Sequence, residues 1–118
     1  MLFLQNPLFI ISTSTGLIFI VTAIIISKYP PRKINMMYGY RTKSSMKSKE
    51  RWDFAQIYST DLLYNYGLLL TLIGVLCYFT SFAIVTATIL SLLIMTILVG
   101  LLIYKTEKAI EDKFGSEE

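Results

Sequence analysis

The polar stretch INMMYGYRTKSSMKSKERWDFAQ, residues 34–56, holds the residues of this sequence whose types and spacing could do chemistry. Arg41 stands beside two tyrosines, Gly39 and Thr42, a setting in which a guanidinium can form paired hydrogen bonds with a carboxylate or a phosphate. Three carboxylates farther along the chain are candidate partners for this arginine: Glu50, Asp53 and Asp61. The stretch therefore predicts either a binding site for an anion or an internal clasp centred on Arg41.

Two further features decide which kinds of chemistry the sequence allows. It contains no histidine, which removes the usual general base and a usual ligand of zinc and haem. Its one cysteine, Cys77, lies inside an apolar run and has no partner for an intrachain disulfide. We expect no catalytic residue, no metal site and no cofactor. A basic cluster that could hold a phosphate leaves open an enzyme or carrier acting on lipid headgroups: Arg41, Lys43 and Lys47.

The elements that must position these residues are membrane-spanning helices. Of the 118 residues, 54% are hydrophobic, and the mean hydropathy is +0.59. Three runs without a charged side chain are each long enough for a helix, rising about 1.5 Å per residue, to cross a bilayer: residues 7–27, 62–79 and 82–104. Only Thr80 and Ser81 separate the last two runs. We predict an all-α integral membrane protein with three transmembrane helices, which form a single module over residues 1–118.

The basic residues decide the orientation that we predict. All eleven lysines and arginines fall in the loop 28–61 or in the C-terminal tail 105–118, and none precedes the first run, which is therefore expected to be retained rather than cleaved as a signal peptide. The positive-inside rule places both basic segments in the cytosol, with the N-terminus outside and the C-terminus inside, in a multi-pass protein of the bacterial cytoplasmic membrane. Membrane lipid is an expected partner of such a loop, and nucleic acid is not.

Between the first two spans we predict an amphipathic helix that lies at the membrane interface. The pair Pro30–Pro31 ends the first span, and Ser44 or Ser45 would cap a helix that runs on toward the second span. Trp52 lies on the apolar side of this helix and is expected to anchor it among the headgroups. The tail continues the third span as a solvated helix that ends at Gly115, and we expect no site in it.

Polar and small residues inside the spans predict contacts between helices. Asp61 at the mouth of the second span and Asn65 within it form a candidate intramembrane polar site, and we expect Asn65 to form an interhelical hydrogen bond. Small residues at suitable spacing permit close helix contact: Ser12 and Gly16, Gly67 and Gly74, and Thr96 and Gly100. The sequence is also compatible with a homodimer.

The polar stretch resembles the signature of the SdpI/YfhL family of bacterial membrane proteins, which runs roughly I-N-x-x-Y-G-Y-R-T-x-x-S-M-K-x-x-E-x-W-x-x-A. The matching residues are Ile34, Asn35, Tyr38, Gly39, Tyr40, Arg41, Thr42, Ser45, Met46, Lys47, Glu50, Trp52 and Ala55. Ser48 and Gln56 stand where many members carry asparagine. Ten of the matching residues are the binding residues that we expect in the motif loop: Asn35, Tyr38, Gly39, Tyr40, Arg41, Thr42, Ser45, Lys47, Glu50 and Trp52.

The resemblance implies a function in self-protection. The member that gives the family its name protects its producer against a secreted, membrane-active peptide and also recruits a transcriptional repressor to the membrane. That member is longer and has extra spans before its motif. We therefore expect a membrane immunity protein that meets a toxic peptide on the outer side and signals to a cytosolic regulator through its loop. Two alternatives stay open: the lipid-headgroup enzyme or carrier, and a small regulatory subunit of a membrane complex.

Overall fold

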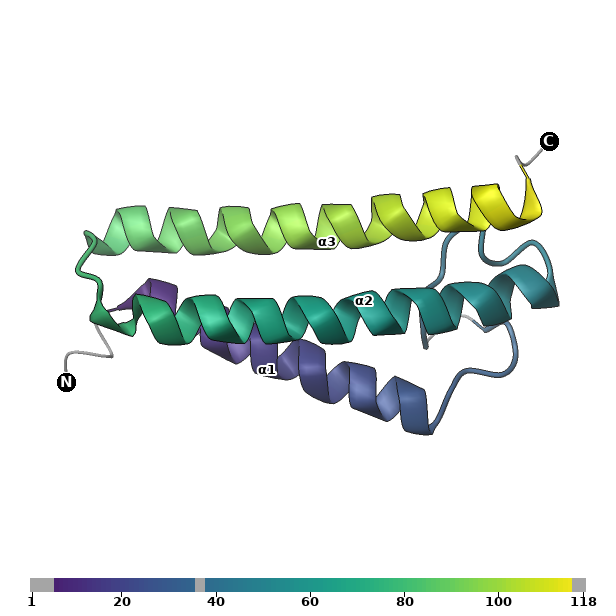
Figure 1. Ribbon diagram of the computed structural model, residues 1–118, viewed down its shortest axis with the longest axis horizontal. Coiled ribbons are helices and arrows are strands. Elements are labelled where there is room, and N and C mark those ends of the chain that lie inside the picture. The colour runs from purple at the N-terminus through teal and green to yellow at the C-terminus, as the bar shows by residue number, and fades with distance from the viewer. Residues whose placement is uncertain (1–5, 36–37, 116–118) are drawn as a thin grey trace.

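Three long helices form the protein in the computed structural model, which describes residues 6–35 and 38–115. They are α1 (Pro7–Lys28), α2 (Lys49–Leu76) and α3 (Ile84–Phe114), and a short 3₁₀ helix, η2 (Cys77–Phe79), follows α2. Figure 1 shows α2 and α3 running side by side in opposite directions, with α1 crossing α2 from behind and diverging from it toward Lys28. The connection between α2 and α3 lies at the end of the molecule where α1 begins.

Each of the three helices is long and apolar enough to cross a membrane, so the described part of the chain confirms an all-helical protein with three candidate spans. Only 17% of each apolar window is buried within the molecule. In water such exposure would be costly, but in a bilayer the outward leucines and isoleucines are surrounded by hydrocarbon. The chain is therefore a multi-pass membrane protein whose helices present most of their apolar surface to lipid.

Local sequence signals account for both ends of α1. Asn6 caps its start by accepting a hydrogen bond from the backbone N–H of Phe9, and Pro7 occupies the first turn, where a missing N–H costs nothing. The helix ends at Lys28, just before the pair Pro30–Pro31, as predicted. The side-chain amide of Asn6 also donates to the backbone oxygen of Cys77 at 2.8 Å, which ties the start of α1 to the end of α2.

The start of α2 differs from the prediction. Ser48, rather than Ser44 or Ser45, is the cap: its backbone is extended, and its hydroxyl accepts from the N–H of Arg51. Ser45 is unable to cap α2 because its hydroxyl closes a turn with Thr42. No separate interfacial helix precedes the second span in the described chain, because residues 49–61 are the first turns of one continuous helix. At about 1.5 Å per residue, the 28 residues of α2 extend about 42 Å, well beyond a hydrocarbon core of about 30 Å.

Glycines allow α1 and α2 to pack backbone against backbone. A Cβ atom added to Gly67 would lie 2.8 Å from the carbonyl oxygen of Gly16, and one added to Gly74 would lie 2.7 Å from the backbone nitrogen of Thr13. This confirms the close contact predicted for Gly16, Gly67 and Gly74. Gly100 is different, since no atom lies within 4 Å of a Cβ placed there, and its side of α3 faces outward.

The third helix continues past the apolar run, as predicted. It begins at Ile84, two residues later than expected, and extends to Phe114, where Gly115 ends it with φ +89°. The last turns of α3 therefore project from the membrane-spanning part at the same end as the first turns of α2 (Figure 1). This arrangement brings the tail into contact with the motif loop.

Candidate functional site

The loop that joins α1 to α2 folds against the first turns of α2 and the last turns of α3. We call this assembly the motif unit; it comprises residues 29–35 and 38–61 and residues 103–114. Its interior is fully buried and mixes apolar side chains with hydroxyl groups: Trp52, Ala55 and Ile110, with Ser45 and Thr106. A buried interior outside the apolar spans shows that the family motif forms a small folded body.

Trp52 is at the centre of the motif unit and is not a membrane anchor. Its side chain is 0% exposed, and its indole N–H donates a hydrogen bond to the backbone oxygen of Pro31 at 2.5 Å. The expectation of an indole among lipid headgroups is therefore wrong. The reason is that the loop after α1 turns back over this face of α2, so that the apolar side of the helix is covered by protein.

Gln56 binds the backbone of Tyr40 through both ends of its amide. Its oxygen accepts from the N–H of Tyr40 at 2.7 Å, and its nitrogen donates to the carbonyl oxygen of Tyr40 at 2.7 Å. Gly39, with φ +96°, is needed beside this pair, because a Cβ atom there would lie 2.5 Å from the Gln56 oxygen. The sequence singled out Gln56 only as a departure from the family pattern, yet its side chain is 4% exposed and holds the loop to α2.

Glu107 joins the motif loop to α3. One carboxylate oxygen, Oε2, accepts hydrogen bonds from the hydroxyls of Tyr40 and Thr42, each at 2.7 Å. Burial raises the pKa of the Tyr40 hydroxyl, and the hydrogen bond and negative charge of Glu107 raise it further, so the group remains a donor at neutral pH. The tail, in which the sequence predicted no site, therefore makes a structural contact with the motif loop.

A sequence signal for this contact was present but easy to miss. Thr106 and Ile110 are four residues apart in the tail and lie on one face of a helix, next to Glu107, although the alternating charges around them are typical of a solvated helix. Both residues are 0% exposed in the structure.

The remaining polar residues of the motif mostly satisfy the backbone of the loop itself. Thr42 and Ser45 exchange hydrogen bonds, since each backbone N–H donates to the other residue's hydroxyl. The side-chain oxygen of Asn35 accepts from the N–H of Tyr38 at 2.7 Å, and the Tyr38 hydroxyl donates to the backbone oxygen of Tyr29. Hydrogen bonds thus hold the loop on either side of residues 36–37. Met36 and Met37 lie outside the described residues.

Arg41 takes no part in this network of the described residues. It is exposed, and within the described chain it forms no ion pair with Glu50, Asp53 or Asp61. Asp53 instead accepts from Lys49, one helical turn earlier, at 2.7 Å. The internal clasp of the loop is therefore made by Glu107 and Gln56, and Arg41 is left at the surface. Two other predicted binding residues are also exposed: Lys47 and Glu50.

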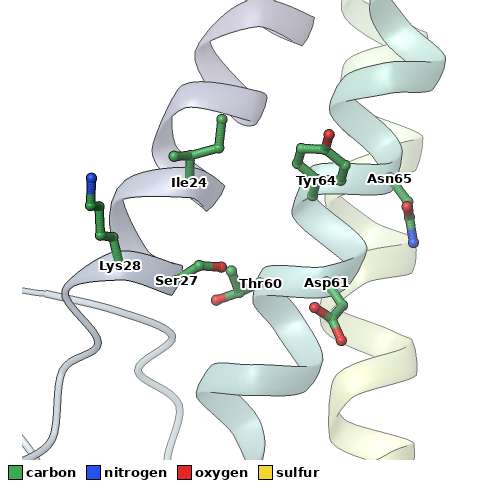
Figure 2. A pocket seen from close by; sticks show the side chains of 7 residues that line it. All are labelled: Ile24, Ser27, Lys28, Thr60, Asp61, Tyr64 and Asn65. Carbon is green, nitrogen blue, oxygen red and sulfur yellow. The ribbon is translucent and has the colours of Figure 1, made fainter.

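Asp61 and Asn65 lie one turn apart on α2, outside the motif unit's interior. Both are exposed, and in the described part of the chain Asn65 forms no hydrogen bond to another helix, contrary to our expectation. They line a cleft of about 610 Å³ together with residues at the end of α1 (Figure 2).

Among residues 6–35 and 38–115, no three His, Cys, Asp or Glu side chains gather where they would hold a metal ion.

Comparison with known proteins places these features in a family context. The model of the SdpI/YfhL protein family matches residues 32–105, which include the motif loop, α2 and most of α3. Glu107 lies just beyond that match. The chain is also 39% identical over 61 residues to an uncharacterised protein, YfhL, of Bacillus subtilis strain 168. The aligned part is 52% of this chain and 56% of that relative, so the match spans about half of each. No solved structure matches the chain.

Proposed function

Because the chain belongs to the SdpI/YfhL family, we propose that it is a membrane immunity protein that protects its own cell against a membrane-active toxic peptide. The observation that carries this proposal is the extent of the family match, which covers the whole motif, the rest of α2 and most of α3. The loop from residue 32 and the first turns of α2, which belong to the motif unit, lie within this match, whereas residues 106–114 of α3 lie beyond it. The function implied by the family signature therefore concerns a segment that this chain retains and folds.

We place the protein in the bacterial cytoplasmic membrane with its N-terminus outside and the motif unit in the cytosol. The eleven lysines and arginines support this orientation, because every one in the described chain lies at the motif end of the helices or in the loop there. Residues 6–27 and 52–104 contain no lysine or arginine, so the opposite end, where α1 begins and α2 turns into α3, carries no basic side chain. A toxic peptide that arrives from outside would meet this uncharged end first.

The helices offer such a peptide a lipid-facing surface. Their outward faces are apolar over the full width of the membrane, for example at Ile18, Leu72 and Ile97, each more than half exposed. In a bilayer, helix association depends on packing contacts and on the loss of lipid contacts rather than on escape from water. The proposal is that the peptide packs against these faces and is kept from forming a pore, while the motif unit holds the three helices in place from the cytosolic end.

The exposed side of the motif loop supports a second part of the same proposal, contact with a cytosolic regulator. Arg41 matches the family signature, yet it does not hold the loop together. A guanidinium at the surface of a rigid loop retains its donors for a carboxylate or phosphate of a partner. Because Arg41 is not needed for the internal hydrogen bonds, its substitution separates binding from folding.

The test is survival of a peptide challenge in a host that lacks its own members of the family. Cells would express wild type, Arg41→Ala or Lys43→Ala at matched membrane levels, and a voltage-sensitive dye would report depolarisation by a panel of secreted amphipathic peptides. Lys43 is the matched control, since it is an exposed basic residue of the same loop at a position where the family signature has no preference. We expect wild type and Lys43→Ala to protect the cells.

Two outcomes would change the proposal. Equal survival with and without the wild-type protein, across the whole panel, would contradict immunity and favour a regulatory subunit of a membrane complex. Full protection by Arg41→Ala would show that immunity does not use the exposed loop. Loss of protection in Arg41→Ala, with an unchanged melting temperature, would identify the loop as the contact for a cytosolic partner.

A further inference from the structure

A polar cleft opens between α1 and α2 at the end where the two helices separate. The helices are in backbone contact at Gly16 and Gly67, and they diverge toward Lys28 (Figure 1). We call the resulting space of about 610 Å³ the α1–α2 cleft; Figure 2 shows the residues that line it: Ile24, Ser27, Lys28, Thr60, Asp61, Tyr64 and Asn65. None of them takes part in the hydrogen bonds that hold the motif unit together.

Thr60 is a buried residue whose hydroxyl lines the cleft and has no partner within the described chain. Its side chain is 6% exposed, and no hydrogen bond to it is formed by residues 6–35 or 38–115. Three threonines in these helices, Thr71, Thr88 and Thr96, donate to the carbonyl four residues earlier, whereas Thr13 and Thr106, like Thr60, have no partner in the described chain. Thr60 points instead toward Ser27 across the gap between the helices (Figure 2). A hydroxyl placed in this way is available to a ligand.

Charges of both signs border the same cleft without neutralising each other. Lys28 comes from the last turn of α1 and Asp61 from α2, and in the described structure neither forms an ion pair. Asp53, in the adjoining cleft of about 550 Å³, is already paired with Lys49. An unpaired cation and an unpaired anion near a membrane surface match a ligand that itself carries one charge of each sign.

The position of the cleft along the helices identifies the ligand as a lipid. The 22 residues of α1 span about 33 Å, so Lys28 and Asp61 lie at the level of the headgroups. On the membrane side of the cleft, Ile24 and Tyr64 form its rim, and exposed apolar side chains such as Val21 and Leu68 continue toward the bilayer centre. A molecule with a polar head in the cleft would therefore place its acyl chains along the helices.

We propose that the α1–α2 cleft binds the headgroup of a phospholipid that carries a primary ammonium group, such as phosphatidylethanolamine. The phosphate would accept hydrogen bonds from Lys28 and from the hydroxyls of Ser27 and Thr60. The ammonium group would donate to the carboxylate of Asp61 and the side-chain oxygen of Asn65. Phosphatidylglycerol has no cation for Asp61, and the quaternary ammonium of phosphatidylcholine has no N–H to donate. This site is independent of the proposed immunity function.

The test is native mass spectrometry of the full chain in detergent, titrated with phosphatidylethanolamine, phosphatidylglycerol and phosphatidylcholine that have identical acyl chains. We expect phosphatidylethanolamine to bind about tenfold more tightly than the other two, a ratio typical of one charged hydrogen bond. Asp61→Asn should remove this preference, and Thr60→Val or Lys28→Gln should weaken all three lipids. Asp112→Asn and Lys33→Gln, which alter exposed charges away from the cleft, should leave the preference unchanged.

Several results would overturn the proposal. They are equal affinity of wild type for the three lipids, an unchanged preference in Asp61→Asn, and full affinity in Thr60→Val. A further arm uses water-soluble glycerophosphoethanolamine as a competitor at the same concentrations as the lipid. Displacement at equal potency would identify a free phosphodiester, rather than a lipid, as the ligand, whereas weak displacement is expected if the acyl chains contribute to binding.

Discussion

The hydroxyl of Tyr40 donates a hydrogen bond of 2.7 Å to the carboxylate of Glu107, which lies 67 residues later in the chain. Tyr40 belongs to the family motif, and Glu107 belongs to the charged end of α3. Together with the Thr42 hydroxyl on the same carboxylate oxygen, this contact connects the loop after α1 to the last helix. The motif unit is therefore closed by a residue outside the recognisable signature, and four expectations follow from its geometry and from the helix packing.

Removing the carboxylate of Glu107 should destabilise the protein. In Glu107→Ala, two partly buried hydroxyls lose their acceptor, and we expect the free energy of unfolding to fall by about 2–3 kcal/mol. Glu107→Gln retains a side-chain oxygen and should cost about 1 kcal/mol. Denaturant unfolding in detergent micelles measures both. The control is Glu111→Gln, an exposed carboxylate one turn later, and an equal loss in the control would contradict the assigned role.

The Tyr40 hydroxyl should make the motif unit sensitive to alkaline pH. Its pKa in the folded protein is raised by burial first and by Glu107 second. A tyrosine in the unfolded chain has a pKa of about 10, so its contribution to stability is complete below about pH 10 and is lost as the pH rises above that value. We expect the melting temperature of wild type to fall more steeply between about pH 9 and about pH 11 than that of Tyr40→Phe. Parallel curves would show that Tyr40 is not responsible.

Truncating the buried indole of Trp52 should cost more stability than truncating an exposed side chain on the same helix. Trp52→Phe removes the hydrogen bond to Pro31 and leaves a cavity, and we expect a loss of about 2–3 kcal/mol in the free energy of unfolding. The control is Ile57→Ala, whose side chain is 68% exposed on the same helix and should change stability by under about 1 kcal/mol. Thermal unfolding in detergent distinguishes the two. A neutral Trp52→Phe would mean that the loop after α1 does not fold over α2.

Two glycines in the spans should respond oppositely to the same substitution. In Gly67→Ala the new methyl group would lie 2.8 Å from a backbone oxygen of α1, and we expect a loss of about 1–3 kcal/mol as the helices move apart. In Gly100→Ala the methyl group meets open space, and alanine's higher helix propensity should stabilise α3 by up to about 1 kcal/mol. The melting temperatures of the two variants, measured side by side, test whether the two substitutions change stability in opposite directions. Similar effects would argue against backbone contact between α1 and α2.

Local signals were sufficient for part of the motif unit. The conformation at Gly39 could be predicted because a glycine between two bulky residues marks a turn, and the end of α1 could be predicted because prolines cannot continue a helix. The cap of α2 could not be predicted from local signals. Three serines precede the helix, and the choice of Ser48 depends on whether Ser45 is occupied by Thr42, which is a property of the folded loop.

The sequence by itself determined the number of helices and the approximate limits of the spans, and it marked Gly16, Gly67 and Gly74 as positions that permit close helix contact, without saying which helices meet. These follow from the length of the uncharged runs and from the size of side chains at helical spacing, which depend on near neighbours alone. Only the tertiary structure decided that Trp52 faces inward, that Glu107 closes the motif unit, that Arg41 stays at the surface, and that Lys28 and Asp61 border one cleft. Such relationships join residues far apart in the chain, and their partners are settled by how the helix ends meet in space.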